Sequence, residues 1–162
     1  MKGKLREFHD SDLGAVKDLI DETVSACYSE YPVEYREHLA EEHHSRKRIL
    51  DRAREGFTLV LEYEGRIMGS GTLIGDSIQG VFVHPSHQRK GFGKAIMREL
   101  EERALEKGVK TVSLESTPLS KGFYDSLGYA TLEEATFSVG KRSFTYYKMA
   151  KELRAREAPH SG

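Results

Sequence analysis

Alternating apolar and polar positions dominate the centre of the chain. Residues 57–63 read Phe-Thr-Leu-Val-Leu-Glu-Tyr, in which positions 57, 59, 61 and 63 are apolar or aromatic at the two-residue period of a half-buried strand. Glu-Gly at 64–65 predicts a turn into a second strand over 66–74, and Gly-Asp at 75–76 predicts a turn into a third over 78–83. The pattern therefore predicts an antiparallel meander.

Helical periodicity appears on both sides of this meander. Residues 5–8 alternate as a short strand, His-Asp-Ser-Asp at 9–12 supplies capping side chains, and apolar residues then recur at helical spacing to about Ala26. After the meander, a helix that starts at Gly91 ends at the favourable pair Lys107-Gly108. The apolar side of this helix consists of Phe92, Ile96, Leu100 and Ala104.

The last third of the chain returns to strands. A strand is predicted over 111–115, a short helix over 119–127, and two further strands over 129–139 and 143–149. Because a strand, a helix and a strand follow one another between 78 and 115, the two strands should run parallel through a right-handed crossover.

Length and charge narrow the functional classes. The 162 residues show neither a repeat nor a linker, so we expect one mixed α/β domain over 1–150 and a charged, frayed tail over 151–162. A formal net charge of −1 does not favour nucleic-acid binding. The chain has no apolar run of membrane-spanning length and no signal-peptide core, so we expect a cytoplasmic protein without a membrane partner. The single Cys27 excludes an intramolecular disulfide.

A basic, glycine-containing loop at 88–93 connects the third meander strand to the long helix. Gly91 and Gly93 remove Cβ atoms at the start of this helix, so its free N–H groups can point at an anion. The helix dipole and the charges of Arg89, Lys90 and Lys94 favour the same anion. The spacing fits neither the dinucleotide-binding fingerprint nor the NTPase P-loop, which leaves another kind of phosphate cradle.

Two sequence segments carry a resemblance to a known family. Gln-Arg-Lys-Gly-Phe-Gly at 88–93 is similar to the Gln/Arg-x-x-Gly-x-Gly/Ala loop of the GNAT acetyltransferase superfamily, and the preceding strand ends in the usual Val-x-Pro. Downstream, Gly-Phe-Tyr-Asp-Ser-Leu-Gly-Tyr at 122–129 resembles the family's Phe-Tyr-x-x-Leu-Gly-Phe/Tyr segment. The resemblance extends over about residues 5–149 and implies a mixed sheet of six to seven strands, splayed between strands 4 and 5 and flanked by about four helices.

This resemblance implies acetyl-CoA as the cofactor, with no metal. The pantetheine arm would lie as a false strand in the splay, beside residues 81–83, and the pyrophosphate would lie on the basic loop. Thr117 stands where many relatives have an asparagine that holds the cofactor, which weakens that one contact. The cofactor-binding residues implied in this way are Val81, Phe82, Val83, Gln88, Arg89, Lys90, Gly91, Phe92, Gly93, Lys94, Thr117, Phe123 and Tyr124.

The same resemblance implies direct acetyl transfer to an amine of a small molecule or a peptide. An amide N–H of Phe82 or Val83 would stabilise the tetrahedral oxyanion. Tyr124 stands at the family's position for the general acid that protonates the leaving thiolate, and a phenol is chemically suited to that role. For the base, Asp76 and Glu115 are both candidates, with Asp76 also explained as a turn residue, and a water chain is a third candidate.

Other readings of the sequence stay open. A non-catalytic acyl-CoA-binding or interaction module with the same fold would explain the lack of an obvious base. His38, His43 and His44 lack the spacing of a metal site. The acidic, tyrosine-rich segment 21–42 would favour a cationic acceptor if its acids lined the slot, although a solvated helix face explains it equally well. Family members often pair as homodimers through their last strands, here 133–149.

Overall fold

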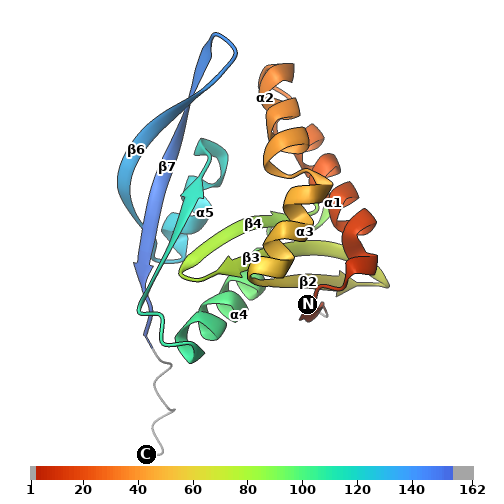
Figure 1. Ribbon diagram of the computed structural model, residues 1–162, viewed down its shortest axis with the longest axis vertical. Helices are drawn as coiled ribbons and strands as arrows, with labels where there is room; N and C mark the ends of the chain where they lie inside the picture. The colour runs from red at the N-terminus through yellow and green to blue at the C-terminus, as the bar shows by residue number, and fades with distance from the viewer. Residues whose placement is uncertain (1–2, 155–162) are drawn as a thin grey trace, which may run out of the picture.

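Seven strands form one mixed sheet in the order β1-β2-β3-β4-β5-β7-β6 (Figure 1). The computed structural model describes residues 3–154. The strands are β1 (Lys4–Glu7), β2 (Phe57–Tyr63), β3 (Arg66–Ile74), β4 (Ser77–Val83), β5 (Thr111–Ser116), β6 (Ala130–Val139) and β7 (Arg142–Glu152). The α-helices are α1 (Leu13–Cys27), α2 (Val33–Glu37), α3 (Arg46–Glu55), α4 (Phe92–Glu106) and α5 (Pro118–Ser126). The predicted meander and mixed α/β class are confirmed.

The sheet opens between β4 and β5. These strands run parallel, as predicted, but they are paired only at Ser77 and Ser113, where the Ser113 N–H also donates to the Asp76 carbonyl at 2.9 Å. Beyond this point β5 pairs along its whole length with β7, so β4 has no strand partner on that side. The expected splay between strands 4 and 5 is confirmed, and it divides the sheet into β1–β4 and β5–β7 (Figure 1).

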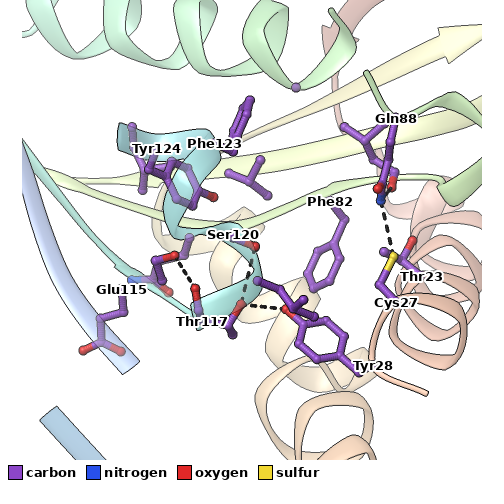
Figure 2. Close-up of a pocket in the computed structure, with 18 of the residues that line it drawn as sticks. Thr23, Cys27, Tyr28, Phe82, Gln88, Glu115, Thr117, Ser120, Phe123 and Tyr124 are labelled. Carbon is purple, nitrogen blue, oxygen red and sulfur yellow. Dashed lines mark hydrogen bonds between the residues drawn. The ribbon is translucent and has the colours of Figure 1, made fainter. Parts of the chain in front are cut away.

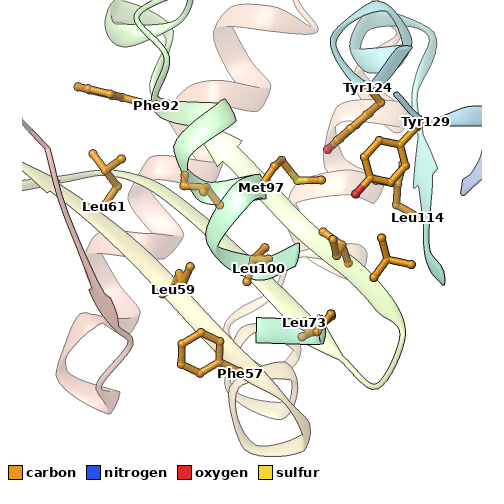
Figure 3. Close-up of a cluster of buried hydrophobic side chains, with 14 of the residues drawn as sticks. Phe57, Leu59, Leu61, Leu73, Phe92, Met97, Leu100, Leu114, Tyr124 and Tyr129 are labelled. Atoms are coloured by element: carbon orange, nitrogen blue, oxygen red, sulfur yellow. The ribbon is translucent and has the colours of Figure 1, made fainter. Parts of the chain in front are cut away.

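Two apolar clusters cover opposite faces of the sheet. On one face, α4 buries the side chains predicted from its periodicity, together with Met97, against Leu59 and Leu61 of β2 (Figure 3). On the other face, α1 and α3 pack over Val60. Gly71 of β3 allows α4 to approach closely, because a Cβ there would lie 2.8 Å from Ile96 Cγ2. With α4 on one side and α1 and α3 on the other, both faces of β2 are buried over residues 57–61.

The segment between α1 and β2, which the sequence patterns did not resolve, forms three helical pieces. Pro32 precedes α2, a π-helix labelled η2 (His38–His43) follows it directly, and Ser45 caps α3 by accepting a hydrogen bond from the Arg48 N–H at 3.2 Å. Tyr35 of α2 is 1% exposed, and its ring lies 4.6 Å from that of Phe144 in the β6–β7 hairpin. This aromatic contact joins the two halves of the molecule across the splay.

The C-terminal boundary lies later than expected. β7 continues to Glu152, so Lys151 is a strand residue, and its ammonium group pairs with Glu101 at 2.8 Å. Leu153 also donates its N–H to the Lys110 carbonyl at 2.8 Å. The expected frayed tail from 151 is therefore wrong for residues 151–153, and its remainder from 155 lies outside the described residues. Across residues 3–154, no helix combines the length and apolar character needed to cross a membrane.

Replacing Asp12 with asparagine is expected to lower the free energy of unfolding by about 1–3 kcal/mol at pH 7. The Asp12 carboxylate accepts hydrogen bonds from Arg6 Nη1 (2.8 Å), Arg6 Nη2 (2.9 Å) and the His9 N–H (2.8 Å). The Arg6 hydrogen bonds hold the pKa of Asp12 below its ordinary value. This contribution is therefore complete above about pH 4, the unfolded pKa, and is lost as the pH falls through the lower folded pKa.

Urea unfolding at pH 7 and again near pH 2 measures this effect. The difference between wild type and Asp12→Asn should shrink at the lower pH. Asp51→Asn is the matched control, because Asp51 pairs with Lys47 on an exposed helix face and should change stability far less than Asp12→Asn. Equal losses in both variants would contradict the account.

Candidate functional site

A cavity of about 730 Å³ occupies the splay between β4 and β5 (Figure 2). Its walls come from β4, the basic loop, the start of α4, the end of β5, α5, the C-terminal end of α1 and the π-helix region. The residues that line it from the predicted set are Val81, Phe82, Val83, Gln88, Arg89, Gly91, Gly93, Lys94, Glu115, Thr117, Phe123 and Tyr124. The structure thus brings most of the predicted site residues to one place.

The basic loop has the backbone geometry of an anion cradle. Arg89 and Gly91 both adopt positive φ, 63° and 85°, and Gly91 is the residue that precedes α4. Gln88 fixes the start of the loop by donating from its side chain to the Val83 carbonyl at 3.1 Å. No ion pair is recorded for Arg89 or Lys94 within residues 3–154, so their charges are available to a ligand. Free helix N–H groups and these cations favour a phosphate here.

Gly93 has a packing role in this loop. A Cβ at Gly93 would lie 3.0 Å from Phe123 Cζ, so its absence lets α5 approach the start of α4. Phe123 lines the cavity and is 36% exposed. The two glycines of the motif therefore serve different purposes, because Gly91 supplies the left-handed backbone and Gly93 supplies the close contact between helices.

The β4 edge offers unpaired backbone groups to the cavity. Residues 81–83 line it, and β4 has no pairing with β5 beyond Ser77. An unpaired amide removed from water costs about 1–3 kcal/mol, so a ligand that carries its own amides would be stabilised along this edge. Gly80 has a φ of 62° and lies where the register between β3 and β4 shifts, so β4 bends as it enters the site.

Tyr124 projects from α5 at the edge of the cavity and is 8% exposed (Figure 2). Its ring makes edge-to-face contacts with Phe123 at 5.1 Å and Tyr129 at 5.8 Å, which fix its orientation. Burial raises the pKa of Tyr124 above its ordinary value, and the neighbouring Tyr28 acts in the same direction. The phenol therefore stays protonated at neutral pH and can donate a proton.

The predicted position Thr117 is part of a hydroxyl chain. Tyr28 Oη and Thr117 Oγ1 lie 2.8 Å apart, and Thr117 Oγ1 donates to Ser120 Oγ at 3.5 Å (Figure 2). Burial raises the pKa of Tyr28, while the hydrogen bonds to Thr117 and Ser120 oppose this effect. Thr117 therefore connects the end of α1 to α5 across the splay and also lines the cavity.

The two candidate bases lie in different places. Glu115, near the end of β5, is exposed and lines the cavity. Asp76 is exposed in the β3–β4 turn and is not among the residues that line it. Its carbonyl accepts the Ser113 N–H, which supports the alternative interpretation of Asp76 as a turn residue.

Two predicted cofactor contacts lie outside the cavity lining. Lys90 is exposed in the loop, and Phe92 is 1% exposed in the core, with its ring 5.3 Å from that of Tyr63. Their contact with a cofactor stays a prediction. The acids of segment 21–42 do not line the cavity, which removes the basis for expecting a cationic acceptor. In the described part of the chain, no group of three or more potential metal ligands is found.

Several lining residues were missed by the sequence patterns. Thr23, Cys27 and Tyr28 come from the end of α1, and Leu39 and His44 come from the π-helix and the residue after it. These residues lie far from the motifs in sequence and reach the cavity through tertiary packing. The tyrosine-rich character of segment 21–42 was the one available signal, and it pointed to recognition helices without identifying which side chains face the cavity.

Comparisons with known proteins agree with this geometry. A family model described as an acetyltransferase (GNAT) domain matches residues 18–153. Glucosamine 6-phosphate N-acetyltransferase from Trypanosoma brucei brucei is 35% identical over 80 residues, 43% of this chain and 54% of that protein. The match thus spans about half the length of this curated relative.

Solved structures share the fold at low sequence identity. A GCN5-related N-acetyltransferase from Rhodopseudomonas palustris has a TM-score of 0.86 at 21% identity, with 94% of this chain and 97% of that chain covered. The PaiA N-acetyltransferase from Thermoplasma acidophilum, solved in complex with coenzyme A, has a TM-score of 0.77 at 19% identity, with 94% and 100% covered.

Proposed function

Because this chain belongs to the GNAT acetyltransferase family, we propose that it is an N-acetyltransferase that moves the acetyl group of acetyl-CoA to an amine of a small molecule or a peptide. One observation carries the proposal: a single cavity runs from the basic loop, past the unpaired edge of β4, to the protonated phenol of Tyr124. The curated relative, named for acetylation of an amino sugar phosphate, supports a small-molecule amine as one class of acceptor.

Acetyl-CoA fits the side chains and backbone groups that line the cavity. Its pyrophosphate would be held by the loop N–H groups, Arg89 and Lys94, and its pantetheine amides would satisfy the free edge of β4. When bound, it supplies an acetyl thioester beside residues 81–83. A backbone N–H of Phe82 or Val83 would stabilise the oxyanion that forms on attack, and one such donor is worth about 3–4 kcal/mol.

Proton transfer would involve two further groups of the chain. Tyr124 would protonate the leaving thiolate, since its buried phenol holds its proton at neutral pH. Glu115 would take the proton from the ammonium form of the acceptor, directly or through water, because it lines the cavity whereas Asp76 does not. Glu115→Gln should then lower kcat/KM for an ammonium acceptor by about 10²-fold or more, and an unchanged pH–rate profile would exclude this role.

Release of free thiol from acetyl-CoA, followed with DTNB over a panel of amines, tests the proposed function. The expected result is amine-dependent thiol release well above the rate without amine, with the acetylated amine found by mass spectrometry. If coenzyme A binds but no amine across a broad panel is acetylated, the chain is a non-catalytic acyl-CoA-binding module instead.

We further propose that the protein acts as a homodimer in the cytoplasm. β6 is an edge strand whose Leu132 is 68% exposed, and edge strands of this kind are usually covered. The unpaired Cys27 suits a reducing compartment. Light scattering should give twice the chain mass, and Leu132→Lys should shift the mass toward that of the monomer; a monomeric wild type would refute the dimer. Cell fractionation should recover the protein with cytoplasmic markers, and recovery in a different fraction would refute the location.

A further inference from the structure

Three buried side-chain nitrogen atoms in the described residues have no hydrogen-bond partner: Arg36 Nε, His44 Nδ1 and Arg52 Nε. All three come from the helical segment between α1 and β2, which forms one wall of the cavity through Leu39 and His44. Buried polar groups in native proteins are almost always paired, so each exception needs an explanation such as a ligand or a water. An arginine nitrogen can only donate, so its missing partner is an oxygen or another acceptor.

Arg52 is the most informative of the three residues. It is 6% exposed, no carboxylate pairs with it in residues 3–154, and its Nη1 donates to the His43 carbonyl at 3.0 Å. A Cβ built on Gly80 would lie 3.1 Å from Arg52 Nη2, and Gly80 itself lines the cavity. Arg52 is not itself among the lining residues, so its guanidinium lies behind Gly80, beneath the bend of β4. Burying a cation without a counter-ion costs free energy. Burial therefore disfavours the charged guanidinium and lowers the pKa of Arg52 to about 10.

His44 places a polar ring in the same part of the cavity. It lines the cavity, and its ring stands edge-on to Phe82 at 4.8 Å. Burial lowers the pKa of His44 well below its ordinary value, and the neighbouring charges of Arg52, Lys17 and Arg48 act in the same direction. The imidazole is therefore neutral, and the buried positive charge without a carboxylate partner at this end is that of Arg52, because Lys17 pairs with Asp21 at 2.7 Å.

One carboxylate lines the same cavity. Glu115 is the only carboxylate among the described residues that line the cavity. Burial lowers the pKa of His43, Arg52 acts in the same direction, and the charge of Glu115 opposes them. The end of the cavity away from the phosphate loop therefore carries a positive region beneath Gly80 and a single negative group on β5. A ligand with an anion and an amine would complement both.

We propose that the acceptor end of the cavity contains an anion-binding subsite formed by Arg52 and His44 at the bend of β4, and that the acceptor is an amine that also carries a phosphate or carboxylate group. This inference rests on the proposed N-acetyltransferase function and names its acceptor class. Oxygen atoms of the anion would supply the partners that Arg52 Nε and the His44 ring lack. The amine of the same molecule would then lie toward Glu115.

Matched pairs of acceptors test the inference through activity. Phosphoethanolamine is compared with ethanolamine, and β-alanine with β-alaninamide, so that the two pairs also distinguish a phosphate from a carboxylate. The anionic member of at least one pair should have a kcat/KM about tenfold to a hundredfold higher. Arg52→Gln should bring this ratio close to one, Arg52→Lys should retain part of it, and the KM for acetyl-CoA should stay unchanged. Arg54→Gln, an exposed position on the same helix with the same change of charge, should keep the wild-type ratio.

A binding measurement decides the inference without turnover. Inorganic phosphate is titrated by calorimetry into protein saturated with coenzyme A, so that the phosphate loop is already filled. Wild type and Arg54→Gln should bind phosphate, and Arg52→Gln or, if that variant does not fold, Arg52→Lys should bind it at least about tenfold more weakly.

The outcomes separate this inference from the proposed function. Equal rates for charged and neutral acceptors, together with no phosphate binding by wild type, would overturn the subsite and leave the N-acetyltransferase function standing; water would then be the partner of the orphaned nitrogens. Phosphate binding that depends on Arg52, with no amine acetylated, would support the subsite and refute the function.

Discussion

Replacing Tyr124 with phenylalanine is expected to lower kcat by about 10²–10⁴-fold, with little change in the KM for acetyl-CoA. The substitution removes one hydroxyl and keeps the ring, so the edge-to-face contacts with Phe123 and Tyr129 remain. The substitution thus removes only the hydroxyl that we propose protonates the leaving thiolate. Because burial raises the pKa of Tyr124, its deprotonation should not limit the wild-type rate below about pH 10. Steady-state kinetics across pH 6–9.5 (about the range in which a phenol keeps its proton) measures both points.

Tyr129→Phe is the matched control for this variant. Tyr129 is also buried and touches Tyr124, but it does not line the cavity, and its hydroxyl donates to Glu101 at 2.8 Å. Loss of the Tyr129 hydroxyl should reduce the free energy of unfolding by about 1 kcal/mol and leave kcat nearly unchanged. If Tyr124→Phe retained the wild-type kcat, the leaving thiolate would not depend on this phenol.

Gly91→Val is expected to weaken coenzyme A binding by about fivefold to a hundredfold. Gly91 has a φ of 85°, and a branched side chain at such an angle costs about 1–3 kcal/mol. The free loop can relax to avoid this strain, so the cost is incurred when coenzyme A requires the cradle geometry. Isothermal titration calorimetry of coenzyme A into the variant measures the change in affinity.

Gly75→Val provides a control with the same backbone strain at a distant turn. Gly75 has a φ of 58° in the β3–β4 turn, and a Cβ at either glycine would meet no atom within 4 Å. Gly75→Val should therefore lose stability and keep its affinity for coenzyme A, whereas Gly91→Val should lose affinity. Unchanged binding by Gly91→Val would show that the left-handed backbone at this position is not needed for the cofactor.

The elements that direct the cofactor side of the site were predictable because their signals are local. Strand alternation predicted the meander, the glycine-containing loop predicted the start of α4, and the apolar spacing of α4 predicted which of its sides is buried. The loop and the segment around Tyr124 each carry a motif of a few consecutive residues. The splay was predicted from the family resemblance alone. The family model confirms the resemblance, and the single paired position between β4 and β5 confirms the splay.

The acceptor side was much less predictable because distant contacts determine it. The segment with α2 and the π-helix is held by Tyr35 against Phe144, which is more than 100 residues away in sequence. Tyr28 reaches the cavity through Thr117, 89 positions later. Residues 43–54 are rich in basic side chains, and nothing in their sequence indicated that Arg52 would be buried while Arg46, Lys47, Arg48 and Arg54 are exposed.

Calorimetric titration of coenzyme A into the wild-type protein tests the central claim most directly, namely that the splay between β4 and β5 and the basic loop together hold this cofactor. The account predicts one coenzyme A bound per chain, with an affinity that falls as salt is raised, because it places the coenzyme A phosphates beside the charges of Arg89 and Lys94, which line the cavity. A well-folded protein that takes up no coenzyme A at any salt concentration would contradict it.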